Sequence, residues 1–160
     1  MVDILYRCGG DLLKFAGDAF IAIWRLCADN YTMGDKADEA INCAIRIQSS
    51  LGSFMCDVDV TLKVKISISA GNFIFCLIGD HMTSTYVVYG LPVLEAKKGE
   101  GYCSSGDIVI SPSVYNCINK TKYYFQKITK GYLKIQKNLK DTHLIMNFLR
   151  AGVIFEAQLQ

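Results

Sequence analysis

The sequence predicts an α+β domain in which helices pack on one face of a largely antiparallel sheet. Three observations lead to this prediction: a pair of apolar runs joined by a short glycine-containing turn, one long amphipathic helical period after them, and several short β-rich runs further along. The 160-residue chain is 51% hydrophobic, which suffices for a single buried core. We therefore expect one folded unit without repeats or linkers.

The first predicted element pair is a hairpin. Its strands are the apolar runs Leu12 to Phe15 and Ala19 to Trp24, and the Gly17-Asp18 joint places Asp18 at or beside the tip. The segment from Asp35 to Met55 then repeats apolar residues every three or four positions and begins with acidic residues. This pattern predicts an amphipathic helix.

The middle of the chain predicts a run of neighbouring antiparallel strands. Thr61 to Ala70 alternates strictly between apolar and polar residues, so we expect a half-buried strand with Lys63 and Lys65 on its open face. After a turn at residues 71–72, the apolar run Phe73 to Ile78 and the β-rich run Ser84 to Tyr89 follow.

The remaining predicted elements are short. Val93 to Lys98 predicts a helix, and Ile108 to Ile110 predicts a strand. The run Ser111-Pro112-Ser113 has the pattern of a helix start, continuing through Cys117, and the same serines also fit a phosphorylation site. We expect late strands at 123–128, 132–135 and 144–149.

Composition excludes several classes of function. The 17 basic and 15 acidic side chains are mixed along the chain, so nucleic acid and anionic membranes are not the expected partners. The seven cysteines are scattered without a C-x-x-C pair, which indicates reduced thiols in the cytoplasm and no zinc site. Any metal should therefore be held by oxygen. No signal peptide or membrane-spanning run is visible in the sequence.

One long segment resembles a known family. Residues 9–24, GGDLLKFAGDAFIAIW, closely resemble the strand–turn–strand of the first cyclase domain of soluble adenylyl cyclases, which are class III nucleotide cyclases. The resemblance continues through VKISISAG and IGDHMTSTYVVYG, and more weakly through ISPSVYNC and MNFLR. Similarity to the GGDEF cyclases rests on the first three residues of the segment alone.

The resemblance implies a ferredoxin-like cyclase domain over residues 1–150 that lacks its first strand and helices. Residues 151–160 no longer follow the family pattern, and their structure stays open. We interpret the abrupt start as the loss of an N-terminal portion of a larger protein. A third reading, an unrelated structural α+β domain, would share none of this order of motifs.

Asp18 matches one of the two carboxylates that in the family hold two Mg²⁺ (or Mn²⁺) ions while the 3′-hydroxyl of ATP attacks the α-phosphate. A Gly-Asp pair taken alone would also fit an ordinary hairpin turn. The resemblance places the partner carboxylate on a preceding strand that this chain does not contain, so only half of the metal site is expected. Asp3 lies too close to Asp18 in sequence to replace it, and we expect it at the solvated end of a helix.

Lys65 matches a family lysine that contacts the ATP phosphates, although a solvated strand lysine would look the same. Lys14 and Lys97 match a second pocket associated with bicarbonate. Lys97 stands where the family has an arginine. The planar guanidinium that could donate two parallel hydrogen bonds to an anion is therefore absent. Lys97 and Lys98 also fit a helix end favoured by the helix dipole.

Three aromatic residues, Trp24, Phe73 and Phe75, would suit a base-stacking platform by chemistry alone. Each lies within an apolar run, so we assign all three to the core.

Two functions follow from the resemblance. The first is part of an adenylyl cyclase core, a phosphorus–oxygen lyase of intracellular signalling that converts ATP to cyclic AMP and pyrophosphate. Such a chain would be inactive until a second cyclase domain supplies the adenine-reading and transition-state groups. The second is a non-catalytic regulatory or dimerisation module derived from a cyclase domain. The choice between ATP and GTP cannot be read from these residues.

Overall fold

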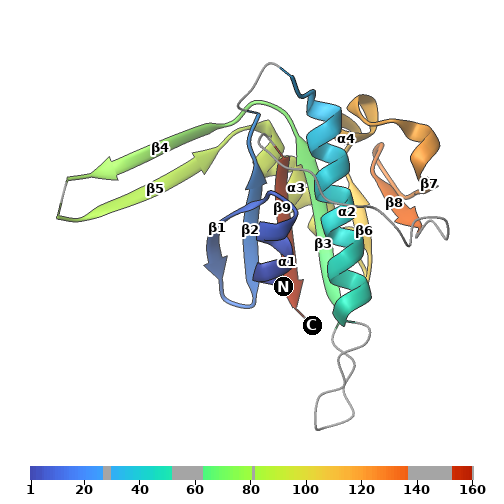
Figure 1. Cartoon of the computed structure of the whole chain (residues 1–160), viewed down its shortest axis with the longest axis horizontal. Coiled ribbons are helices and arrows are strands. Elements are labelled where there is room, and N and C mark those ends of the chain that lie inside the picture. The colour runs from blue at the N-terminus through green and yellow to red at the C-terminus, as the bar shows by residue number, and fades with distance from the viewer. Residues whose placement is uncertain (27–29, 52–62, 81, 137–152, 160) are drawn as a thin grey trace, which may run out of the picture.

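The structure is a computed structural model that describes residues 1–26, 30–51, 63–80, 82–136 and 153–159. Its strands are β1 (Asp11–Ala16), β2 (Ala19–Trp24), β3 (Val64–Ala70), β4 (Ile74–Gly79), β5 (Ser84–Tyr89), β6 (Ile108–Ile110), β7 (Tyr124–Lys127), β8 (Leu133–Gln136) and β9 (Val153–Leu159). Its α-helices are α1 (Val2–Arg7), α2 (Met33–Leu51), α3 (Leu91–Glu100) and α4 (Pro112–Cys117). Figure 1 shows helices against a sheet and one long hairpin that projects away.

The described strands form a seven-stranded sheet in the order β1-β2-β9-β3-β6-β8-β7 and a separate two-stranded sheet of β4 and β5. Neighbours in the large sheet are antiparallel except β3 and β6, which are parallel. The predicted α+β class and largely antiparallel sheet are therefore confirmed. The predicted strand at 144–149 lies outside the described residues.

Local sequence signals fix the beginnings of two predicted helices. At the start of α2, the Thr32 N–H donates to Asp35 Oδ2 at 2.9 Å and the Asp35 N–H donates to Thr32 Oγ1 at 3.2 Å. At the start of α4, the Ser111 hydroxyl accepts from the Val114 N–H, which confirms the predicted helix start. The predicted extension of the first of these helices to Met55 lies outside the described residues.

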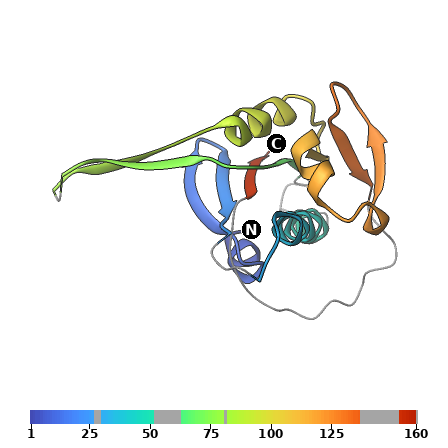
Figure 2. The same cartoon turned by 90° about the horizontal axis from the view of Figure 1, so that it is seen from above.

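The helices cover both faces of the large sheet. Helices α1, α2 and α4 lie on one face, as predicted, whereas α3 lies on the other (Figure 2). Helix α3 approaches β3 closely at Gly99, where an added Cβ would lie 2.2 Å from Ser67 Oγ. The face of β3 that was predicted to be open is therefore covered, and Ser67 and Ser69 are fully buried. Lys65, at the end of this face, is half-buried.

Strands β4 and β5 do not join the sheet beside β3. They form the arm, which we define as residues 74–80 and 82–89, and Figure 1 shows it extending from the body. Midway along the arm the Tyr86 hydroxyl donates to the Leu13 carbonyl, and Phe75 stacks on Tyr86 with ring centroids 5.4 Å apart. Phe75 is 47% exposed, so its assignment to the core was wrong, because no element among the described residues forms a second layer over it. Trp24 is fully buried and Phe73 is half-buried, as expected of core residues.

The tail whose structure the sequence left open contains β9. This strand lies between β2 and β3 and is antiparallel to both. The centre of the large sheet is therefore built from the last residues of the chain.

Five of the seven cysteines fall within the described residues, and all five are free thiols. Cys43 and Cys103 are buried, and Cys8, Cys76 and Cys117 are half-buried. No helix in the described ranges is both long enough and apolar enough to cross a bilayer.

Candidate functional site

The tip of the β1–β2 hairpin presents Asp18. Ala16 pairs with Ala19, so Gly17 and Asp18 form a two-residue loop. Gly17 has φ +65°, and an added Cβ there would meet no atom within 4 Å. Glycine is thus required by the backbone angle and not by lack of space, and glycine at the first loop position is typical of a type II′ turn. Asp18 follows it and is exposed, as predicted.

The sheet register brings Asp18 and Lys65 to the same end of the sheet. Gln158 of β9 pairs with Ala19 on one side and with Lys65 on the other. Because hydrogen-bonded strands lie about 4.8 Å apart, the backbones at Ala19 and Lys65 are about 10 Å apart. Directly paired residues share a face of the sheet, so Lys65 lies on the same face as Ala19, the residue that follows Asp18.

The described residues do not make a metal site by themselves. Asp18 is the single expected carboxylate ligand, and no group of three or more His, Cys, Asp or Glu side chains suited to a metal ion occurs in the part of the chain that the structure describes. A two-ion Mg²⁺ or Mn²⁺ site needs more oxygen ligands than one carboxylate offers. The half-site therefore remains a prediction.

Lys14 and Lys97 lie on the same side of the sheet. A β-bulge between Leu12 and Lys14 pairs Lys14 with Ile21, and Leu13 belongs to the same hydrophobic cluster as Ala96, the neighbour of Lys97. Lys97 is 69% exposed, and its Nζ lies 3.3 Å from Glu100 Oε2. A carboxylate already close to this ammonium competes with any anion, and bicarbonate binding remains a prediction.

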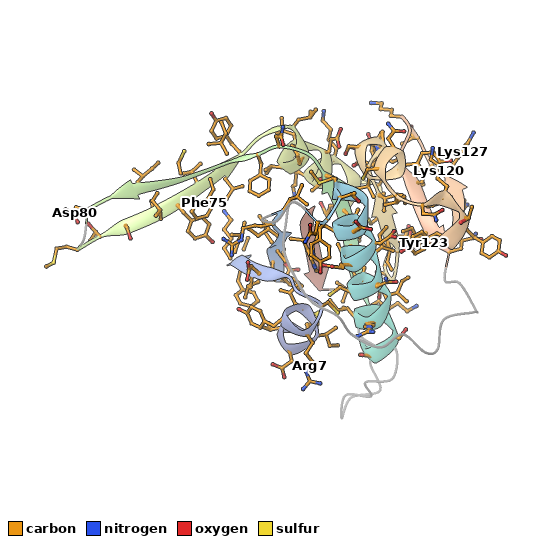
Figure 3. All side chains as sticks on the ribbon, turned by 45° about the horizontal axis from the view of Figure 1, so that its top comes forward. Arg7, Phe75, Asp80, Lys120, Tyr123 and Lys127 are labelled. Carbon is orange, nitrogen blue, oxygen red and sulfur yellow. The ribbon has the colours of Figure 1, made fainter. Side chains whose placement is uncertain are left out.

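The arm carries an apolar surface that the sequence analysis missed. Figure 3 shows Phe75 on the arm and Asp80 at its tip. Seven large apolar side chains there are between 42% and 83% exposed: Ile74, Phe75, Leu77, Ile78, Met82, Val87 and Tyr89. The run in β4 is apolar without alternation, which by itself predicts a strand buried on both faces. The structure shows that β4 is instead an exposed strand, because no element of the described ranges covers its outer part.

Asp80 accepts two backbone hydrogen bonds at the end of the arm. Its Oδ1 accepts hydrogen bonds from the Met82 and Thr83 N–H groups at 2.9 and 2.8 Å. These two donors hold the pKa of Asp80 below its ordinary value, because they stabilise the carboxylate. A shallow depression beside this turn is lined by Ile78, Met82, Thr83, Ser84 and Thr85, and by none of the predicted site residues.

Comparison with known proteins gives the same family by sequence and by fold. A sequence model described as "Adenylate and Guanylate cyclase catalytic domain" matches residues 5–147. Adenylate cyclase type 10 from Oryctolagus cuniculus is 25% identical over 120 residues, and so is its counterpart from Homo sapiens. These 120 residues are 75% of this chain and 7% of each relative, so the chain spans a small part of their length.

Two solved structures show the fold. The guanylyl cyclase Cya2 superposes with a TM-score of 0.71 at 20% identity, covering 94% of this chain and 79% of that one. The guanylate cyclase domain of RhGC from Catenaria anguillulae, solved in complex with GTP, gives a TM-score of 0.67 at 21% identity over 99% of this chain and 78% of that one.

Proposed function

The chain belongs to the family of adenylate and guanylate cyclase catalytic domains, and from that premise we propose that it is one half of an adenylyl cyclase core. In this proposal it converts ATP to cyclic AMP and pyrophosphate only when a second cyclase domain faces it. The observation that carries the proposal is the shared position of Asp18 and Lys65 at one end of the sheet. ATP is preferred to GTP because the curated relatives are adenylate cyclases.

The reaction makes one phosphorus–oxygen bond and breaks another. The 3′-oxygen of the ribose attacks the α-phosphorus, pyrophosphate leaves with the bonding electrons, and the hydroxyl proton passes to a base or to water. Lys65 carries a flexible point charge suited to phosphate oxygens, and Asp18 carries a hard oxygen suited to a divalent cation. The facing domain must supply the groups that hold the base and the remaining negative charge.

The arm supports pairing with a second domain. A lone two-stranded hairpin is at best marginally stable in water, and large exposed apolar patches mark interaction surfaces. The exposed residues of the arm, among them Leu77 at 72% and Met82 at 83%, form such a patch. Covering it with a facing cyclase domain would stabilise the hairpin and the pair together.

The decisive experiment mixes the purified chain with a purified second cyclase domain and Mn²⁺, then measures cyclic AMP from ATP and cyclic GMP from GTP. We expect cyclic AMP from the mixture and none from the chain alone. Asp18→Asn should lower this activity by at least about tenfold, a loss of at least 1.4 kcal/mol in transition-state stabilisation. Asp3→Asn is the matched control, since Asp3 is also exposed but belongs to α1.

Two outcomes of this assay would contradict the proposal. Cyclase activity that survives Asp18→Asn would contradict the proposed half-site. Cyclase activity of the chain without a partner would contradict it as well. Cyclic GMP as the main product would leave the half-site standing and correct the choice of nucleotide.

The second candidate function is a non-catalytic dimerisation module. The arm supports association under either candidate, and this second one is favoured because no group of three or more metal-ligating side chains occurs in the described residues. In that case the mixture should associate tightly and yield no cyclic nucleotide under any metal condition. Sedimentation velocity on the samples of the cyclase assay measures association, which both candidates predict. Association together with activity supports the catalytic half-site, and association without activity supports the module.

A further inference from the structure

Strand β9 lies inside the large sheet, between β2 and β3. Its pairing with β2 runs from Ala19 opposite Gln158 to Trp24 opposite Val153, and its pairing with β3 runs from Val64 opposite Leu159 to Ala70 opposite Val153. It thus lies between the N-terminal hairpin and the rest of the sheet (Figure 1). The family match ends at residue 147, so β9 lies beyond the matched part of the chain.

The hairpin and the rest of the sheet are joined through β9. Among the described strands, neither β1 nor β2 pairs with β3 or with any strand beyond it in the sheet. Without β9, the facing sides of β2 and β3 would each present a row of unpaired N–H and C=O groups in the middle of the domain. Phe20 and Ile66, which face each other across Ala157 in the register, are buried in the same core cluster on either side of this strand.

The register of β9 also decides where Asp18 lies relative to Lys65. A slip of two residues between β2 and β9 would move the hairpin tip by about 7 Å along the sheet. A slip of one residue would turn the facing side chains to the other face. The hairpin turn fixes β1 only against β2. It therefore sets neither the distance from Asp18 to Lys65 nor the face of the sheet on which the side chains of β2 lie.

We propose that residues 153–159 are the positioning segment of the site: inserted between β2 and β3, they hold the Asp18 loop at the level of Lys65. The segment acts through the backbones of the two strands that it joins, and not as a group that touches the substrate. The roles of Asp18 and Lys65 rest on the proposed function, whereas the placement of the strand does not.

Hydrogen–deuterium exchange on the full chain tests the placement. The amides of 153–159 should exchange at least about tenfold more slowly than those of the arm, since a central strand is bonded on both sides. Ala157→Pro removes a ladder donor from the middle of β9 and should speed exchange in β2 and β3. The matched control is Val87→Pro in β5, which should affect exchange in the arm alone.

Cross-linking of the intact chain provides a second test that does not depend on how well Ala157→Pro folds. Ser67 lies directly opposite Glu156, so Ser67→Cys with Glu156→Cys should form a disulfide under mild oxidation. Ser67→Cys with Ala157→Cys is the register-shifted control and should form none. Rapid exchange of 153–159 in the unmodified chain, or equal cross-linking of both pairs, overturns the inference.

The cyclase assay then separates this inference from the proposed function. If β9 is protected and cross-links in register but the mixture makes no cyclic nucleotide, the proposed function fails and the placement stands. If the mixture is active and Ala157→Pro leaves the activity unchanged while β2 and β3 exchange faster, the positioning role fails. We expect the activity of the Ala157→Pro mixture to fall by at least about tenfold.

Discussion

The burial of strands β3 and β4 is the opposite of what their compositions suggest. Strand β3, VKISISA, carries polar residues at alternate positions, yet from Ile66 to Ala70 it is buried on both faces. Strand β4, IFCLIG, is almost wholly apolar, yet Leu77 is 72% exposed and Ile78 is 54% exposed. Helix α3 covers the polar face of β3, and no described element covers the outer part of the arm.

This difference shows that composition alone does not decide burial in this domain. A serine face can be buried when a glycine in the covering helix permits close approach, as Gly99 does over Ser67. An apolar strand can be exposed when its binding partner belongs to another molecule. Exposure of β4 is therefore the informative observation, because a buried apolar strand would need no explanation.

The largest expected effect comes from truncating the same side chain in the two regions. Ile66 is fully buried in β3, so Ile66→Ala should lower the free energy of unfolding by about 3 kcal/mol. Ile78→Ala in the arm should change it by less than about 0.5 kcal/mol. Urea unfolding followed by the fluorescence of Trp24, the single tryptophan, measures both. Equal losses would mean that the arm is covered in the isolated chain.

The next effect concerns association and not stability. Leu77→Asp places a charge on the exposed arm and should raise the dissociation constant of the pair with a second cyclase domain by at least about tenfold. The melting temperature of the isolated chain should stay unchanged. Tyr124→Asp is the control, because Tyr124 is 65% exposed on the edge strand β7, outside the arm. Equal effects of the two substitutions on binding would show that the arm is not the interface.

Two neighbouring serines test the polar face of β3. Ser67 Oγ is buried and has no hydrogen-bond partner among the described residues, whereas Ser69 Oγ donates to the Pro92 carbonyl at 2.5 Å. Ser67→Ala should therefore stabilise the fold by about 1 kcal/mol, and Ser69→Ala should destabilise it by about 1 kcal/mol. Paired urea titrations compare the two variants. A loss of stability in Ser67→Ala would indicate that this hydroxyl has a partner in solution.

The smallest expected effect is the pH dependence of the reactivity of the Cys8 thiol. A hydrogen bond from the Cys43 thiol lowers the pKa of Cys8 to about 7, whereas burial raises the pKa of Cys103 to about 12. Alkylation of Cys8 by iodoacetamide should therefore reach half its maximal rate near pH 7. Cys43→Ala removes the donor and should move this midpoint upward.

The same lowered pKa predicts the direction of a stability change. Because the folded form holds the Cys8 thiolate more favourably than the unfolded chain, this contribution is lost as the pH falls through about 7. In Cys8→Ser the stability between pH 6 and pH 9 should lose this dependence. A midpoint of Cys8 alkylation that does not move in Cys43→Ala would contradict the assigned cause.

The elements that the sequence predicts well are those with local signals. Gly17 supplies the left-handed turn angle of the hairpin, and Thr32 with Asp35 caps α2 through bonds three residues apart. The position of Asp18 at a turn follows from the first of these signals. Boundaries of this kind need no knowledge of the rest of the fold.

The rest depends on contacts between distant residues. The relation of Asp18 to Lys65 is set by Gln158, and no local pattern links these three positions. The covering of Ser67 depends on α3, and Phe75 is exposed because no element in the described part of the chain packs over it. Hydrophobic alternation reports what a strand can bury, and only the assembled sheet decides what is buried.

The pairing of Ala19 with Gln158 has a kinetic consequence, since it joins segments from nearly opposite ends of the sequence. Contacts of such high sequence separation require closing a long loop before any hydrogen bond compensates for the lost chain entropy, and they slow folding. During synthesis the hairpin and β3 would leave the ribosome long before their common neighbour, with their strand edges open to other chains. Newly made protein should therefore aggregate more readily than refolded protein at the same concentration, unless chaperones shield those edges.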